Sequence, residues 1–216
     1  MFRQIRPALV SVVAFTVLCG IVFPAVITGL GQALFPRQAN GSLVSVGGRV
    51  VGSALIGQTF SGPGYFHGRP SAAGAGYDGG ASGGTNLGPT SDKLIHGVHV
   101  RLPDGSEAPG GFAGVADLAA AYRLENDLPA GAPVPPDAVT RSASGLDPHI
   151  TPANAALQTP RVARERGLAE ADVRAAVTRN TRGRQLGVLG EPRVDVLALN
   201  LELDRIAAGA AAGTPR

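Results

Sequence analysis

The chain has 216 residues, 44% of them hydrophobic, and a formal net charge of +3. This length fits one domain and is too short for a polytopic transporter or a complete ion pump. The lone Cys19 excludes an internal disulfide and a zinc site built from cysteines. Tryptophan is absent and aromatic residues make up 5%, a poor supply of the stacking surfaces that nucleic-acid-binding proteins use. We therefore expect no nucleic-acid partner.

The N-terminal segment is long, apolar and uncharged. No charged side chain occurs in the 30 residues from Pro7 to Pro36, and about 20 apolar residues suffice to cross a bilayer. We predict a membrane anchor over residues 1–36, with the span at about 8–34 and a kink at Pro24. A cleaved signal peptide is the main alternative, although its apolar region would be only about 7–15 residues long. A buried core helix is the other alternative.

The orientation of this span depends on few charges. Arg3 and Arg6 precede the span, whereas Arg37 and Arg49 follow it. With the terminal amino group, one more positive charge precedes the span than follows it, which favours a cytoplasmic N-terminus. We predict a single-pass protein of the cell membrane with an extracytoplasmic soluble domain over residues 37–206 and a flexible tail over 207–216.

The first part of the soluble domain is rich in turns. Two β-rich runs, 43–46 and 49–56, flank Gly47 and Gly48, which predicts a hairpin. Residues 61–90 contain ten glycines and three prolines, which predicts a loop. A further loop or exposed hairpin is expected over residues 96–112.

Helices are predicted later in the chain. Residues 115–126 form one, and a second begins at the Thr151-Pro152 capping pair and ends at Gly167. A third covers residues 168–180, with acidic residues early and arginines late, as the helix dipole favours. Residues 188–190 and 194–200 have the pattern of strands. The predicted fold class is α+β: one transmembrane helix followed by a single small soluble domain.

Two possible ligand sites are weak. Gly79 and Gly84 have the spacing of a phosphate-binding loop, but Thr85 stands where that loop needs its lysine. His96 and His99 could hold a metal ion only on a helix and with a third ligand, so we predict no metal site.

Two further clusters are expected to be structural. Ser142, Ser144, Asp147 and His149 lie within eight residues, but a catalytic triad is assembled in three dimensions. A turn at Asp147-Pro148, with the serines bonding nearby backbone, is the better explanation of these residues. Residues 161–184 contain seven arginines, which we interpret as a solvated, partly salt-bridged helical face.

Five motifs, in this order after a single span, carry a resemblance to a known family. The motifs are residues 64–71 (GYFHGRPS), 82–89 (SGGTNLGP), 139–150 (VTRSASGLDPHI), 161–167 (RVARERG) and 194–201 (VDVLALNL). With these motifs, the chain closely resembles the KdpC subunits of the Kdp potassium-transporting P-type ATPases. Two departures are an insertion at about residues 96–112 and Arg141, where the family more often has a small residue.

The resemblance implies an accessory subunit that is not an enzyme on its own. Its implied partners are an ATP-hydrolysing P-type subunit, a potassium-channel-like subunit and membrane lipid. It implies stabilisation of the complex and a catalytic chaperone role that raises the ATP affinity of the hydrolytic subunit. No cofactor is expected to bind firmly, although ATP could be reached through that partner.

Direct nucleotide binding in a ternary complex is the alternative function, and a membrane-anchored exported enzyme is another. The residues that we expect to face a partner are Tyr65, Phe66, His67, Arg69, Pro70, Ser71, Ser82, Gly83, Gly84, Asn86, Gly88, Pro89, Ser144, Gly145, Leu146, Asp147, Pro148 and His149.

Overall fold

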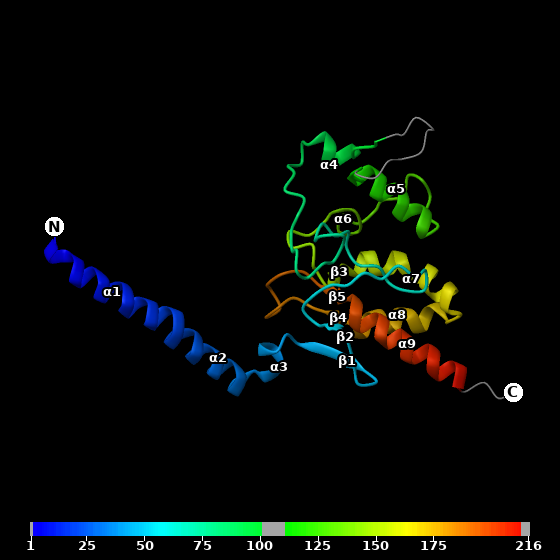
Figure 1. Ribbon diagram of the computed structural model, residues 1–216. Helices are drawn as coiled ribbons and strands as arrows, with labels where there is room; N and C mark the ends of the chain where they lie inside the picture. Colours follow the sequence, from blue (N-terminus) through cyan, green and yellow to red (C-terminus); the bar gives the residue numbers. More distant parts are fainter. Residues whose placement is uncertain (1, 101–110, 213–216) are drawn as a thin grey trace. The chain divides into compact units, whose positions relative to one another are not determined.

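The computed structural model describes residues 2–100 and 111–212. It divides into two compact units, Met1–Leu55 and Ile56–Arg216, and each is described by itself. The predicted α+β class is confirmed, because an apolar N-terminal helix precedes a domain of helices and small sheets (Figure 1). The β-hairpin groups with the N-terminal unit, whereas the division predicted after residue 36 assigned it to the soluble domain.

The N-terminal unit begins with a helical span that changes type in its middle. The apolar run Ile5–Leu34 has 30 residues, a mean hydropathy of 2.6 and no buried side chain. Pro24 lies in the first turn after the π-helical segment. A proline removes one helical hydrogen bond, and a wider π turn accommodates the ring. The successive segments are η1 (Phe2–Gln4), α1 (Ile5–Val17), the π segment η2 (Leu18–Val22) and α2 (Phe23–Leu34).

The predicted hairpin follows this span. The short helix α3 (Pro36–Ala39) leads into β1 (Leu43–Val46) and β2 (Arg49–Ser53), which pair antiparallel. Gly47 and Gly48 both have positive φ, +57° and +79°, as the favoured two-residue hairpin turn requires. The register shifts by one residue between Val44 and Ser45, which marks a β-bulge.

The core of the globular unit lies between three helices and a small sheet. The sheet has the order β3-β5-β4 and is antiparallel throughout. Helix α8 (Glu170–Arg179) packs against both α7 (Pro152–Arg166) and α9 (Val196–Ala212). The strands are β3 (His149–Ile150), β4 (Thr181–Arg182) and β5 (Arg193–Asp195). The core residues are Phe66, Ile150, Ala155, Val162, Ala163, Val173, Ala176, Val194, Val196, Leu199 and Leu203.

A second, smaller cluster surrounds Tyr122. It joins α5 (Val115–Glu125) to α6 (Pro136–Val139), and α4 (Asp92–His96) contacts α5. Val98 and Phe112 form an isolated antiparallel bridge. The other residues of the predicted insertion, 101–110, lie outside the described residues.

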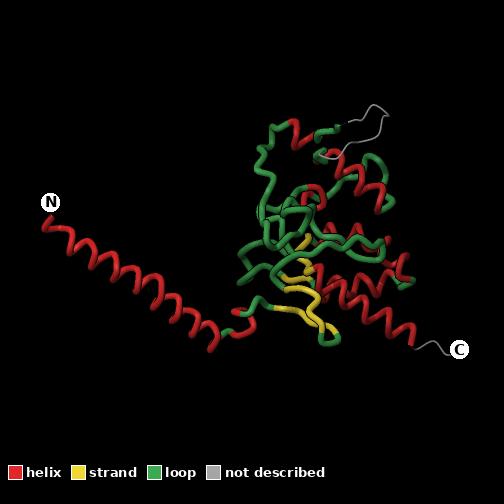
Figure 2. Tube along the Cα trace, viewed as in Figure 1, coloured by secondary structure: helices red, strands yellow, loops and turns green. Residues whose placement is uncertain are grey.

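Three of the predicted helices are confirmed by α5, α7 and α8. Thr151 caps α7, since its hydroxyl accepts a hydrogen bond from the Asn154 amide, and Gly167 ends the helix in the left-handed region. The predicted loop over residues 61–90 is confirmed and contains no helix or strand (Figure 2).

The C-terminal prediction needs correction. Residues 188–190 form no strand: residues 186–188 form a turn that is closed by an isolated bridge between Gln185 and Leu189. Strand β5 ends at Asp195, after which residues 196–200 are helical. The Asp195 carboxylate accepts a hydrogen bond from the Ala198 amide at 3.0 Å and so begins α9. Val196, Leu199 and Leu203 then bury one face of the helix in the core. The predicted tail is helical through Ala212.

Candidate functional site

Residues 65–71, the first of the three predicted partner-facing segments, are held in the globular unit by side-chain amides from two helices. The other two segments are residues 82–89 and 144–149. Asn200 of α9 accepts from the Phe66 amide and donates to the Phe66 carbonyl, both at 2.9 Å. Gln158 of α7 makes the same two contacts with His67, at 2.8 and 3.1 Å. We call Gln158 and Asn200 the amide clamp. It satisfies main-chain groups that a neighbouring strand would otherwise pair, and it buries the Phe66 ring completely.

Arg161 of α7 extends this polar network. Its side chain is 2% exposed, and it donates to Tyr65 O at 3.1 Å, Gln158 Oε1 at 2.9 Å and Asn126 Oδ1 at 3.0 Å. The guanidinium also contacts the Pro63 carbonyl. Burial lowers the pKa of Arg161, and these acceptors satisfy its donors. The predicted solvated arginine face is therefore wrong at this position.

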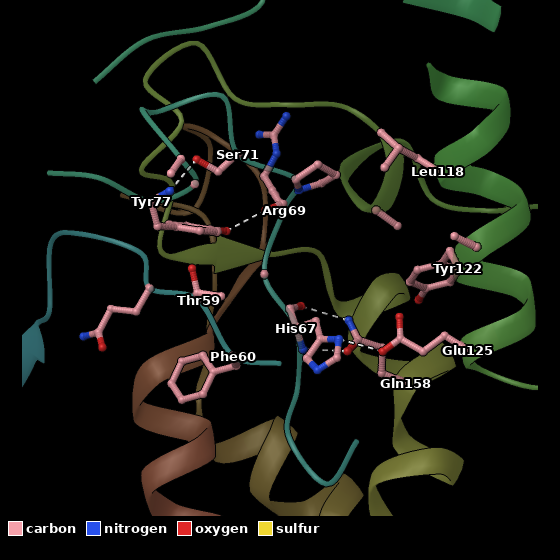
Figure 3. A pocket seen from close by; sticks show the side chains of 17 residues that line it. Thr59, Phe60, His67, Arg69, Ser71, Tyr77, Leu118, Tyr122, Glu125 and Gln158 are labelled. Carbon is pink, nitrogen blue, oxygen red and sulfur yellow. Dashed lines mark hydrogen bonds and ion pairs between the residues drawn. The ribbon is translucent and has the colours of Figure 1, made fainter. Parts of the chain in front are cut away.

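His67 connects this polar network to helix α5. Its Nδ1 lies 2.6 Å from Glu125 Oε1 (Figure 3), and its Nε2 lies 3.0 Å from the Gly62 carbonyl. The ring therefore links the Glu125 carboxylate of α5 to the loop carbonyl of Gly62. The hydrogen bond from His67 lowers the pKa of Glu125 and outweighs the opposing effect of burial.

Arg69 joins segment 65–71 to segment 144–149. Its Nη1 donates to Asp147 Oδ2 at 3.0 Å, and its Nε donates to the Thr140 carbonyl at 3.3 Å. Burial raises the pKa of Asp147, but hydrogen bonds from His149 and Arg69 outweigh it, and the pKa is lowered overall. Asp147 Oδ1 also accepts from the His149 amide at 3.0 Å, which confirms the predicted local turn.

The three segments, residues 65–71, 82–89 and 144–149, meet at Gly145. The Ser71 hydroxyl donates to the Gly145 carbonyl at 2.6 Å, and the Gly83 amide donates to the Ser144 carbonyl at 2.9 Å. Gly145 has φ +67°, and a Cβ there would lie 2.7 Å from Ala73 N and 2.7 Å from Gly83 O. The backbone therefore requires glycine both for its conformation and for this close approach.

Tyr77 braces the same segments from the loop that follows. Its hydroxyl donates to the Arg69 carbonyl at 2.6 Å, and its amide donates to Ser71 Oγ at 2.8 Å. Burial, with the negative charge of Asp147, raises the pKa of Tyr77 to about 12. The phenol therefore stays protonated and keeps donating throughout the physiological range.

The structure brings together most of the predicted residues, but not all. We call residues 65–71, 82–84 and 144–149 the loop platform. Asn86, Gly88 and Pro89 are exposed and lie in the same loop beyond it. Sequence reasoning missed Gln158, Asn200, Arg161 and Glu125. The available signal for α7 was the spacing of Asn154, Gln158 and Arg161, which places polar side chains on one helix face.

A cleft of about 370 Å³ opens beside the loop platform (Figure 3). Its two basic side chains are already engaged, since His67 pairs with Glu125 and Arg69 pairs with Asp147. An anionic ligand would have to displace a carboxylate from one of them. The lining residues include His67, Arg69, Tyr77, Tyr122, Glu125 and Gln158.

Within residues 2–100 and 111–212, no three His, Cys, Asp or Glu side chains gather in a way that could hold a metal ion. His99 Nε2 instead lies 3.1 Å from the His96 carbonyl and 3.3 Å from Asp117 Oδ2. The described geometry of these two histidines is thus that of a local contact with α5.

Comparison with known proteins gives one consistent result. The family model for the K+-transporting ATPase c chain, KdpC, matches residues 5–205. Three relatives described as potassium-transporting ATPase KdpC subunits are similar over nearly their whole length. The relative from Koribacter versatilis is 50% identical over 204 residues, 94% of this chain and 95% of its own. That from Caulobacter vibrioides is 52% identical over 205 residues, 94% of both chains. That from Mycobacterium tuberculosis is 50% identical over 206 residues, 95% of this chain and 100% of its own.

Proposed function

Because the chain belongs to the KdpC family, and is thus a membrane subunit of a potassium-transporting ATPase, we propose that it is a non-catalytic accessory subunit that stabilises the assembled complex. The observation that carries this proposal is the loop platform. Its Arg69, Ser71 and Asp147 side chains all make contacts within the chain. Polar groups used in this way favour a fixed docking surface over reaction chemistry.

We further propose that the platform and the exposed loop beyond it contact the ATP-hydrolysing or the channel-like subunit. The test is Pro89→Arg, which adds bulk and charge at an exposed position of that loop. Co-purification of the partner subunits and potassium-stimulated ATPase activity should both fall. The matched control is Ala130→Arg in another exposed loop, which should leave both measurements unchanged. Full assembly and activity of the Pro89→Arg complex would contradict the proposed surface.

A catalytic chaperone role is the finer part of the proposal. With the soluble domain outside the cytoplasm, its effect on ATP affinity must pass through the span as a coupling free energy. Such couplings are typically ~1–3 kcal/mol, or about 5–150-fold in affinity. The complex lacking this chain should therefore bind ATP more weakly by a factor in that range. Equal ATP affinity with and without the chain would refute this role.

Direct nucleotide binding in a ternary complex remains the alternative, and the cleft beside His67 and Arg69 would be its site. A phosphate there would first have to displace Glu125 or Asp147 from these two side chains. Protease treatment of sealed, right-side-out vesicles separates the two. Digestion of the globular unit from outside supports the extracytoplasmic orientation and excludes contact with cytoplasmic ATP. Complete protection supports the alternative and overturns the orientation proposed here.

A further inference from the structure

The β-hairpin of the N-terminal unit exposes an unusual amount of apolar surface. Leu43, Val46 and Val50 are 54%, 43% and 60% exposed. The pairing places Leu43 and Val50 on one face and Val46, opposite Arg49, on the other. Among the residues that the structure describes, the hairpin forms a sheet of two strands only, and an isolated two-stranded hairpin is marginally stable in water. We therefore expect these exposed apolar side chains to be covered by something outside the unit.

The hairpin is fixed to the end of the span by polar contacts. The Gln32 and Asn40 side-chain amides donate to each other, at 3.2 and 3.0 Å. The Ser42 amide donates to the Arg37 carbonyl at 2.9 Å. From the other strand, the Ser53 hydroxyl donates to the Gly41 carbonyl at 2.7 Å. Whatever surrounds the last turn of the span consequently also lies within reach of the hairpin.

The charge of this unit has one sign. Its four arginines are Arg3, Arg6, Arg37 and Arg49, and the first acidic residue of the whole chain is Asp78. Arg37 and Arg49 lie on the side of the span where the hairpin is. Basic residues next to a span attract anionic headgroups, and their long side chains can reach phosphates while apolar neighbours enter the boundary with the acyl chains.

We propose that the hairpin is a lipid-docking element that lies in the headgroup region of the bilayer, with Leu43 and Val50 entering the boundary layer and Arg37 and Arg49 binding anionic phospholipid. The observations favour lipid over a protein surface because one compact unit combines a bilayer span, exposed aliphatic side chains and positive charge without acidic residues. This goes beyond the accessory function proposed above and does not depend on which side of the membrane carries the globular unit.

The absence of tryptophan makes a direct test possible. Single variants Val50→Trp and Leu43→Trp of the full chain are reconstituted into vesicles that contain brominated phosphatidylcholine, with or without phosphatidylglycerol. Both tryptophans should be strongly quenched, and more so with phosphatidylglycerol. Ile21→Trp, within the span, sets the upper limit. Leu186→Trp, at a 90% exposed position of the globular unit, sets the reference and should be quenched at most half as much.

The charge contribution is tested with Arg37→Glu/Arg49→Glu in the Val50→Trp background. The extra quenching due to phosphatidylglycerol should disappear, whereas the same exchange at the exposed Arg205 should leave it intact. Quenching of both hairpin tryptophans at or below the Leu186→Trp reference overturns the proposal. So does an emission shift to the blue that occurs only on assembly with the partner subunits, because that identifies a protein as the occupant.

Discussion

The span Ile5–Leu34 and helix α7 place their polar side chains in opposite ways. The span has no charged residue after Arg6 and buries no side chain within the unit. Helix α7 buries Asn154, Gln158 and Arg161 and leaves much of its other face in water. Both are helical along their length, apart from the π segment Leu18–Val22 in the span and Pro160 in α7, so the helical hydrogen bonds do not explain this difference between the side chains.

This difference shows that the medium around a helix, lipid or folded protein, determines whether polar side chains can be buried on it. Lipid tails offer no hydrogen-bond partners, so a helix exposed to them must be apolar all round. In α7, the buried Asn154, Gln158 and Arg161 each have a partner from another segment, whereas Thr159 donates to a carbonyl of the helix itself. A buried polar group without a partner is costly, so α7 can be polar inside because the 63–67 backbone and the side chains of Tyr122 and Asp137 supply those partners.

The largest effect is expected where that polar interior is broken. Arg161→Ala removes the donors to Tyr65 O, Asn126 Oδ1 and Gln158 Oε1 and leaves these groups and Glu125 without their cation. The free energy of unfolding of the globular unit should fall by about 3–5 kcal/mol, because three acceptors each lose a donor at about 1–3 kcal/mol. Thermal unfolding of the full chain in detergent, followed by circular dichroism, measures this change.

Arg174→Ala is the matched control on the neighbouring helix. Arg174 is exposed and pairs with Glu170 at 2.6 Å across one helical turn. Such surface pairs contribute ~0.5 kcal/mol or less. Equal losses for the two variants would mean that the buried network contributes no more than a surface ion pair.

The converse change is to place a charge in the span. Ile21→Arg should disfavour membrane insertion by about 2.5–3.5 kcal/mol, because the guanidinium meets hydrocarbon near the middle of the helix. The fraction of chain that resists alkaline carbonate extraction from membranes should fall accordingly. Ile21→Leu should change nothing. Undiminished integration of the arginine variant would show that this segment is not surrounded by lipid.

A smaller difference, about 1–3 kcal/mol, is expected between two glycine variants, one of them at the crossing of the three loops. Gly145→Ala places a Cβ 2.7 Å from Ala73 N and from Gly83 O, whereas Gly187→Ala, also at positive φ, meets nothing within 4 Å. Both variants lose about 1–2 kcal/mol to the backbone conformation, and Gly145→Ala loses about 1–3 kcal/mol more to the overlap. Comparison of their melting temperatures isolates the second loss. Equal melting temperatures would show that the backbone at Ala73 and Gly83 moves away from the added Cβ at no cost in stability.

The smallest effect is expected from acid. Hydrogen bonds from His67 and from His149 and Arg69 lower the pKa values of Glu125 and Asp147 below 4.5 and 3.8. A lowered pKa in the folded state stabilises the fold above the ordinary pKa, and this contribution is lost as the pH falls through the folded value. Glu125→Gln and Asp147→Asn should therefore flatten the decline of the melting temperature between about pH 5 and pH 2. An unchanged decline would assign acid sensitivity to other carboxylates.

Local signals made part of the fold predictable. The span follows from composition, the hairpin turn from Gly47 and Gly48, and α7 from its Thr151 cap and Gly167 stop. Helix α9 was missed because residues 194–200 alternate like a strand. Its helical signal lay in the longer spacing of Val196, Leu199, Leu203 and Ile206, which only becomes visible beyond residue 200.

The candidate site was predictable as a set of loops but not as a network. The loops were identified by motif resemblance, and most of their residues do come together. The amide clamp could not be inferred, because Gln158 and His67 are 91 residues apart and Asn200 and Phe66 are 134 residues apart. Nothing in the local sequence of a buried amide indicates which distant backbone it will pair with.

The pairing of Asn200 with Phe66 also determines when the globular unit can fold in the cell. The ribosome must add 134 residues after Phe66 before its hydrogen-bond partner exists. At bacterial and eukaryotic synthesis rates of about 5–20 residues per second, this takes roughly 7–27 s. Throughout that interval the nascent chain displays an uncovered Phe66 ring, so the period between insertion of the anchor and release of the finished polypeptide is when this subunit most needs protection from aggregation and proteolysis.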